Sequence, residues 1–215
     1  MSKSKSKTVR SLSVAAASVL IIGFASVASA QIAGSAHDFS SYGWSNGQIC
    51  VPCHTPHDAN TSVALAPLWN HDVTSAVYTV YSNPATLDAT VGQPAGISKL
   101  CLSCHDGTVA VDSFGGASGT TFISSVDPNA DFGTDLSDDH PISFTYDAAL
   151  ATADGELFDP TTTSSGLGGT IQDDMLFSNQ VECASCHDVH NVAGNPYLLV
   201  KANTASALCL TCHDK

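Results

Sequence analysis

Basic residues are scarce in this chain once its first 30 residues are set aside. The remainder holds three lysines, Lys99, Lys201 and Lys215, no arginine, and all twenty Asp and Glu. Three positive charges against twenty negative ones leave it a net charge of −17. Such a surface repels nucleic acid and anionic lipid, so we expect neither as a partner. It suits basic redox proteins or metal cations, and it could equally serve only to keep an exported protein soluble.

Long apolar runs are also absent, apart from one near the N-terminus. Residues 12–27 form an apolar stretch that follows Lys3, Lys5, Lys7 and Arg10 and ends in Ala28-Ser29-Ala30. This pattern is typical of a signal peptide, 1–30, cleaved before Gln31. A membrane anchor is the alternative, but the run is short for a bilayer and is diluted with Ala and Ser. We therefore predict an exported protein, extracellular or on the outer surface, alternatively periplasmic, with no membrane span after cleavage.

Regular hydrophobic periodicity is hard to find after residue 30, because Gly, Ser, Thr, Asp and Asn interrupt nearly every segment. A chain of this kind would struggle to bury enough apolar surface to offset its ordering entropy. It therefore needs internal cross-links or a bound group that stabilises the fold. We predict mostly coil, with short helices confined to the cysteine motifs and a few short strands, among them 108–111 and 120–124.

No cysteine lies outside one repeated pattern. The pattern C-x-x-C-H occurs four times, as Cys50-Val-Pro-Cys53-His54, Cys101-Leu-Ser-Cys104-His105, Cys183-Ala-Ser-Cys186-His187 and Cys209-Leu-Thr-Cys212-His213. It is the attachment signature of haem c, in which two thiols bond the porphyrin and the histidine binds the iron. Zinc sites, disulfides and a thioredoxin-like pair are alternatives, but none of them explains a histidine after every second cysteine. We predict four haem c groups with the proximal ligands His54, His105, His187 and His213.

Methionine, the common partner of histidine on haem iron, occurs only once after residue 30, as Met175. Histidines outside the motifs number five: His37, His57, His71, His140 and His190. This balance predicts bis-histidine haems of low potential, with one histidine left over. His57 and His190 each follow a proximal histidine by three residues, so they project to the same side and must serve a different haem. For the other irons we favour His71 and His140, then His37.

The four motifs form two pairs. In each pair a C-x-x-C-H-x-x-H element precedes a Cys-Leu-[Ser/Thr]-Cys-His-Asp element. We predict one tetrahaem domain, 31–215, with haem pair one in 37–106, a haem-free insert in 107–182 and haem pair two in 183–214. Four haems within one domain of this size are expected to stack on one another and to supply its core. The predicted fold class is therefore a multihaem cytochrome c.

The residues that flank the motifs resemble those of the OmcE-type extracellular tetrahaem c-type cytochromes of metal-reducing bacteria. The shared segments, in the same order, are His37-Asp38-Phe39, Cys50-Val-Pro-Cys53-His54-Thr-Pro-His57, Pro67-Leu-Trp-Asn-His71, Cys104-His105-Asp-Gly-Thr-Val-Ala-Val, Asp139-His140-Pro-Ile and Cys186-His187-Asp-Val-His190. Members assemble end to end into filaments with a continuous haem stack, bis-histidine ligation throughout and one ligand supplied across the subunit boundary. The resemblance implies a head-to-tail homopolymer here.

Three functions stay open at this point. The first is a conductive filament subunit that reduces external acceptors, and the second is a monomeric periplasmic electron shuttle. The third, a multihaem reductase, needs an open iron position with catalytic Lys, Arg or Tyr, whereas this chain has histidines enough to saturate every iron. We therefore expect an electron-transfer protein and not an enzyme. Its expected partners are copies of itself, redox proteins and extracellular metal acceptors.

Overall fold

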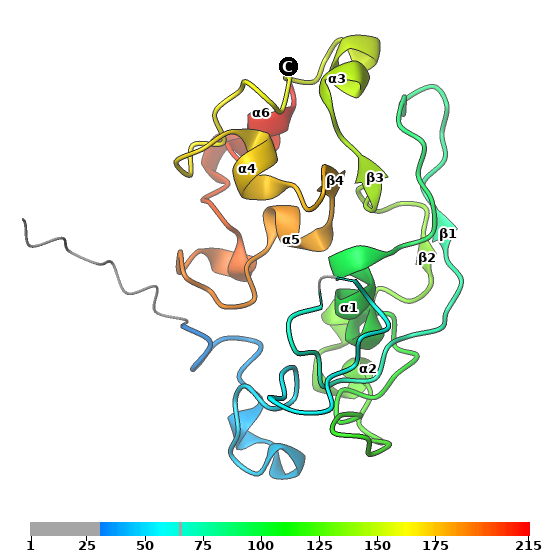
Figure 1. Ribbon diagram of the computed structural model, residues 1–215, viewed down its shortest axis with the longest axis vertical. Helices are drawn as coiled ribbons and strands as arrows, with labels where there is room; N and C mark the ends of the chain where they lie inside the picture. The colour runs from blue at the N-terminus through cyan, green and yellow to red at the C-terminus, as the bar shows by residue number, and fades with distance from the viewer. Residues whose placement is uncertain (1–30, 65) are drawn as a thin grey trace, which may run out of the picture.

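The structure is a computed structural model that describes residues 31–64 and 66–215, so the predicted signal peptide lies outside the described residues. The two ends of the long axis are formed by residues 38–45 and by α3 (Ala148–Asp154) with the C-terminus (Figure 1). In the described ranges, no helix has the length and apolar character that a bilayer crossing requires.

Short helices mark the cysteine motifs, as predicted. The longest, α1 (Gly96–His105), ends on the second motif, while α5 (Cys183–Cys186) and α6 (Cys209–Cys212) are single turns on the third and fourth. The first motif makes the same turn, in which the His54 N–H donates to the Cys50 carbonyl at 2.8 Å. This turn is not part of a helix. The prediction of coil with short helices at the motifs is confirmed.

The prediction that helices are confined to the motifs is wrong. Three helices lie in the 107–182 insert: α2 (Ile123–Val126), α3 and α4 (Ile171–Met175). The Asp147 carboxylate caps α3 by accepting the Leu150 N–H at 2.9 Å. Thr170 and Asp173 form a capping box at the start of α4. Local capping, which weak hydrophobic periodicity does not reveal, starts α3 and α4, whereas no side chain caps α2. Isolated 3-10 turns complete the chain: η1 (Phe39–Ser41), η2 (Gly43–Ser45), η3 (Pro128–Ala130), η4 (Pro196–Leu198) and η5 (Thr204–Ser206).

The strands form two separate pairs. β1 (Thr79–Val80) runs parallel to β2 (Asp135–Leu136), and β3 (Phe144–Thr145) runs antiparallel to β4 (Gln180–Val181).

The predicted strands at 108–111 and 120–124 are wrong: the first is irregular and the second enters α2. One backbone hydrogen bond joins the two segments: the Val111 N–H donates to the Thr121 carbonyl at 2.7 Å. The Asp112 carboxylate accepts the N–H groups of Thr120 and Thr121, which replaces a strand ladder.

The insert packs directly against the last two motifs. Figure 1 shows β3, β4, α3 and α4 beside one another. The buried cluster there consists of six residues of the insert and one that precedes α6: Phe144, Tyr146, Ala151, Ile171, Met175, Val181 and Leu208. The partly buried Cys186 and Cys212 pack against this cluster. Met175, only 2 % exposed, belongs to the cluster. A smaller cluster of Tyr78, Leu102 and Leu136 covers α1.

Candidate haem-binding site

The cysteines of successive motifs are neighbours in space. No disulfide joins any two of the eight, and α1 packs against α5. Cys53 of the first motif lies near Cys104 of the second. Cys101 lies near Cys183 of the third, and Cys186 lies near Cys209 of the fourth. The four motifs therefore follow one another in a continuous row.

Three proximal histidines are oriented by a backbone carbonyl. The Nδ1 atom of His54 lies 2.6 Å from the Pro67 oxygen. That of His105 lies 2.7 Å from the Ala130 oxygen, and that of His187 lies 3.0 Å from the Tyr197 oxygen. A histidine that donates through Nδ1 keeps the lone pair of Nε2 free for a metal. This is the tautomer that haem iron requires.

The segments that hold His54 and His187 share the same backbone hydrogen bonding beyond the cysteine motif. Thr55 donates its N–H to the Leu68 carbonyl at 2.9 Å, and Asp188 donates to the Leu198 carbonyl at 2.6 Å. The two leucines share a left-handed backbone, with φ of 53° and 57°. Sequence reasoning missed these backbone acceptors. The signal that could have found them is the Pro followed by apolar residues after each C-x-x-C-H-x-x-H element, at Pro67 and Pro196.

Three proximal histidines also face a second imidazole from outside their own motif. The ring centroids are 6.0 Å apart for His105 and His37, 6.2 Å for His54 and His190, and 6.4 Å for His213 and His140. A metal–imidazole bond is about 2 Å long, so two rings that bind one metal from opposite sides have centroids roughly 6 Å apart. The spacing of all three pairs fits a metal held between them.

The remaining histidines form no such pair in the described part of the chain. His187 and His57 are both exposed. His71 is 2 % exposed, and its Nδ1 lies 2.7 Å from the Asp72 oxygen while its Nε2 lies 3.5 Å from the Cys104 sulfur. Of the three candidates favoured by the sequence, the structure thus brings His37 and His140 to a proximal ring and does not bring His71.

His37 is held in the neutral form that binds metal. Burial, and then the nearby His105, His187 and His190, lower the pKa of His37 from 6.5 to about 4. Burial and then His140 also lower the pKa of His213. Both imidazoles are therefore favoured as neutral ligands at pH 7.

Several buried polar atoms among the described residues have no hydrogen-bond partner in the chain. They include Nδ1 of His37 and the indole Nε1 atoms of Trp44 and Trp69. Trp69 lies against the ring of His54, with centroids 6.5 Å apart. Orphaned buried donors are rare in folded proteins and call for an explanation. A haem with its carboxylate groups supplies both a metal for the imidazoles and acceptors for the indoles, so the residues fit this group.

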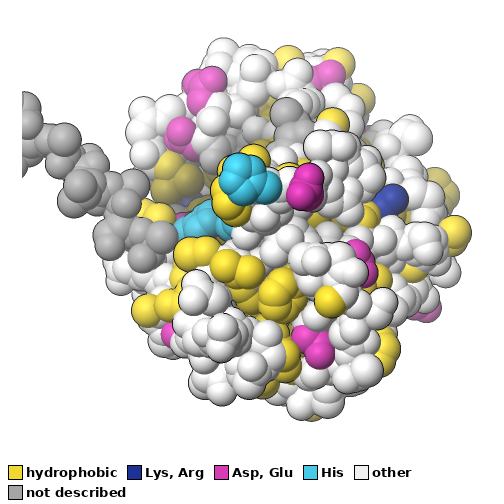
Figure 2. Space-filling model, turned by 60° about the horizontal axis from the view of Figure 1, so that its bottom comes forward, with side chains coloured by type: hydrophobic (Ala, Val, Ile, Leu, Met, Phe, Trp, Pro, Cys, Tyr) yellow, Lys and Arg dark blue, Asp and Glu magenta, His cyan; other side chains and the backbone are white. Residues whose placement is uncertain are grey.

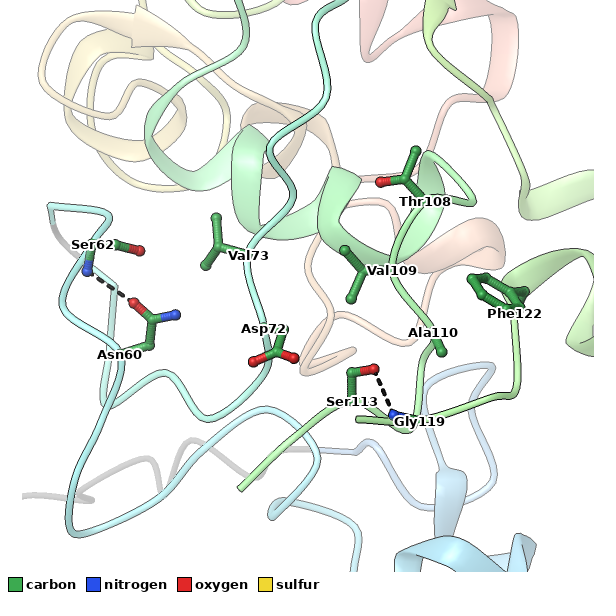
Figure 3. A pocket seen from close by; sticks show the side chains of 10 residues that line it. All are labelled: Asn60, Ser62, Asp72, Val73, Thr108, Val109, Ala110, Ser113, Gly119 and Phe122. Atoms are coloured by element: carbon green, nitrogen blue, oxygen red, sulfur yellow. Dashed lines mark hydrogen bonds between the residues drawn. The ribbon is translucent and has the colours of Figure 1, made fainter. Parts of the chain in front are cut away.

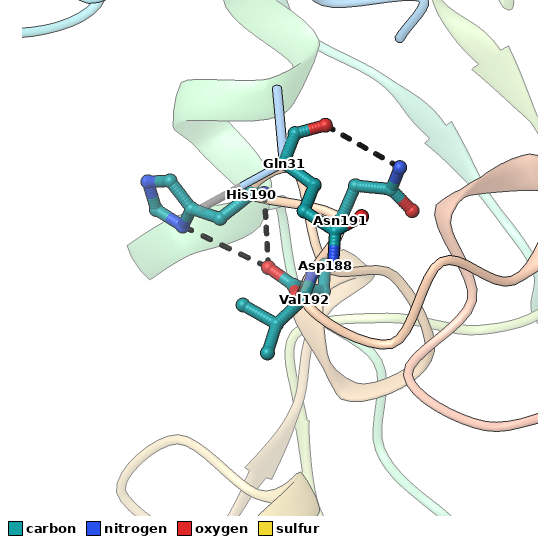
Figure 4. A network of polar contacts seen from close by, with 5 residues as sticks. All are labelled: Gln31, Asp188, His190, Asn191 and Val192. Atoms are coloured by element: carbon teal, nitrogen blue, oxygen red, sulfur yellow. Dashed lines mark hydrogen bonds and ion pairs between the residues drawn. The ribbon is translucent and has the colours of Figure 1, made fainter. Parts of the chain in front are cut away.

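The loop that carries His190 is fixed by Asp188 (Figure 4). The Asp188 carboxylate accepts the N–H groups of His190 at 2.9 Å and Val192 at 2.8 Å. One of its oxygens lies 3.7 Å from Nδ1 of His190. The Gln31 N–H donates to the His190 carbonyl at 2.7 Å, which ties the start of the predicted mature chain to the same loop.

Two cavities lie near the first motif. One, of about 530 Å³, opens between residues 60–73 and 108–122, and Asp72 is the only charged residue in its wall (Figure 3). None of the predicted haem-binding residues lines it. The second, of about 490 Å³, is lined by both His57 and His71.

Comparison with known proteins identifies the motif class. Residues 176–215 match the family model of the doubled CXXCH motif, which covers the third and fourth motifs. The match supports a multihaem c-type cytochrome. No curated protein matches the chain. Motifs of this family attach haem c covalently, and proteins that carry them generally transfer electrons.

Proposed function

We propose that the mature chain carries four haem c groups and passes electrons along them. The eight motif cysteines would hold the porphyrins, and His54, His105, His187 and His213 would bind the irons. The ring spacings support His37 as the second ligand at the haem of His105, His190 at that of His54, and His140 at that of His213. When bound, haem iron supplies a one-electron Fe(III)/Fe(II) couple, whose potential bis-histidine ligation keeps low.

The continuous row of motifs supports transfer over the length of the molecule. Thiols of successive motifs are neighbours, so the attached groups would lie close together from the first motif to the fourth. His190, on the segment of the third motif, would complete the haem of the first. A ligand shared in this way fixes the distance between two haems, and short fixed distances favour rapid electron transfer.

The observation that carries the proposed assembly is the match between the two unpaired, exposed histidines. His187 is the one proximal histidine without a second ring, and His57 is the exposed candidate without a proximal ring. We propose that His57 of one copy completes the haem at His187 of the next. His71 is too deeply buried for this role and would be the histidine left over.

Exposed apolar side chains occur on the segments that hold the two unpaired histidines. Val189, Val192 and Tyr197 lie beside His187, with exposures of 40, 48 and 86 %, and Leu68, near the first motif, is 58 % exposed. Figure 2 shows hydrophobic side chains gathered beside two histidines on the face that comes forward. Exposed apolar patches mark sites of association. They support contact between copies, and we propose that this contact repeats in a head-to-tail filament outside the cell or on its surface.

Negative-stain microscopy of the haem-loaded protein tests this function. We expect filaments for the natural chain and discrete particles for His57→Ala. His71→Gln is the matched control and should still form filaments, because His71 lies inside one subunit. Filaments that persist in His57→Ala would overturn the proposed contact, and discrete particles of the natural chain would favour a periplasmic shuttle.

A reductase is the second candidate because of the same unpaired His187. In a chain that never assembles, the iron at His187 would keep an open position, which substrate reduction needs. Nitrite and sulfite are the probes for this activity. Turnover by the monomeric, haem-loaded chain would establish the reductase, whereas inertness supports electron transfer alone.

A further inference from the structure

Lys201 is held against the attachment loop of the fourth motif. Its Nζ donates to the Ser165 carbonyl at 2.6 Å and to the Thr211 hydroxyl at 2.9 Å. Thr211 lies between the two cysteines of the motif and is 7 % exposed. The ammonium group is therefore fixed beside the residues that hold the haem, on the side where the 161–170 loop crosses.

The surroundings leave room for the ammonium group and fix its place. Gly166 has a φ of 77°, and a Cβ added there would come within 3.0 Å of Nζ. Ser165, which supplies the carbonyl, is fully buried. The other described lysines are placed differently: Lys215 is exposed and pairs with Glu156, and the ammonium group of Lys99 makes no hydrogen bond or ion pair within the described ranges.

Carboxylates face the same region. Asp154 lies close enough to His213 for their charges to interact. Asp154 and Asp159 both lie near Tyr146, whose hydroxyl approaches the Cys212 carbonyl. Negative charge disfavours the addition of an electron to a nearby iron, so Lys201 is the group that offsets these acids.

We infer that Lys201 raises the reduction potential of the haem held by Cys209, Cys212 and His213. Reduction adds one electron to the ferric iron and no proton, and a neighbouring positive charge stabilises the added negative charge. The interaction is screened less for a partly buried ammonium than for an exposed one. This inference rests on the proposed function, since it presumes a haem at the fourth motif.

Spectroelectrochemical titration of the haem-loaded full chain tests the inference. For Lys201→Gln we expect one of four one-electron components to shift, its ratio of reduced to oxidised haem falling about tenfold at a fixed potential, which is about 59 mV. Lys201→Arg keeps the charge and should leave that component in place. Lys215→Gln, which removes an exposed lysine near the same motif, should move it far less.

A purely structural role for Lys201 predicts a different outcome. Thr211→Val removes one of the two hydrogen bonds of Lys201 but keeps its ammonium group. If the charge is what matters, the potential of the haem at the fourth motif stays in place in Thr211→Val, whereas a structural role predicts that it shifts. An unchanged component in Lys201→Gln, or an equal shift of all four components, would overturn the inference. Haem content and the low-spin spectrum of the natural chain test the proposed function separately, so the two failures are distinguishable.

Discussion

Removing His37 should open one iron to an external ligand. His37 is the ring that faces His105 at 6.0 Å, and burial lowers its pKa to about 4, so it is a neutral ligand over the whole physiological range. In His37→Ala no other described histidine faces His105. The haem of the second motif should change from low spin to high spin and bind carbon monoxide in its reduced state.

The expected magnitude follows from the ring pairs. Three of the four motifs have a second imidazole within the chain, and His187 has none. An isolated natural chain should therefore bind one carbon monoxide for every four haems, and a filament should bind none. His37→Ala adds one in either state. Titration of the reduced protein with carbon monoxide, followed in the Soret region, gives these ratios.

The matched control is His71→Gln. His71 is more deeply buried than His37, but it faces no proximal ring, so its replacement should add no carbon monoxide site. The reasoning is refuted if His37→Ala binds no more carbon monoxide than the natural chain, or if His71→Gln binds one more. Either result would show that ring spacing in the chain does not identify the axial ligands.

Three further outcomes are expected. Met175→Ala should lower the free energy of unfolding by about 2–5 kcal/mol in urea titrations, because Met175 is 2 % exposed, and should leave the haem spectrum unchanged. Tyr78→Phe should cost about 1–3 kcal/mol because it removes the 2.5 Å bond to the buried Asp106, whereas Tyr81→Phe, on the surface, should cost little. In the haem-free chain, where no iron is bound to His37, its folded-state pKa of about 4 lies below the ordinary 6.5, so the unfolded chain takes up a proton first as the pH falls. The free energy of unfolding should therefore fall by about 3 kcal/mol between pH 6.5 and 4 in acid titrations monitored by circular dichroism. A free energy of unfolding that stays constant over this window would contradict the lowered pKa of His37.

The positions of the motifs were predictable because haem attachment is written in contiguous residues. Two cysteines and a histidine within five positions specify one helical turn, and all four motifs adopt it. The coil-rich character was predictable because polar residues and glycines interrupt nearly every segment. The strand expected at 120–124 does not form, for a local reason. Thr120 and Thr121 have strand-forming side chains, but the Asp112 carboxylate takes their N–H groups and no ladder forms.

The pairing of distant histidines could not be read from sequence spacing. His37 reaches His105 across 68 positions and His140 reaches His213 across 73, distances set only by the fold. His71 was favoured to complete the ligand count, and its ring nitrogens lie against the Asp72 and Ala110 carbonyls. The backbone acceptor at Ala130 carries no side-chain signal, whereas those at Pro67 and Tyr197 lie at or beside a proline that follows a C-x-x-C-H-x-x-H element.

A cryo-EM map of the assembled, haem-loaded protein tests the central claim most directly, because it shows both ligands of every iron. The proposed arrangement predicts four haems in one row, with His37, His190 and His140 bound within the chain and His57 of the neighbouring copy bound opposite His187. A map in which the iron at His187 is bound by a histidine of the same chain, or in which the copies do not form a continuous row, would contradict it.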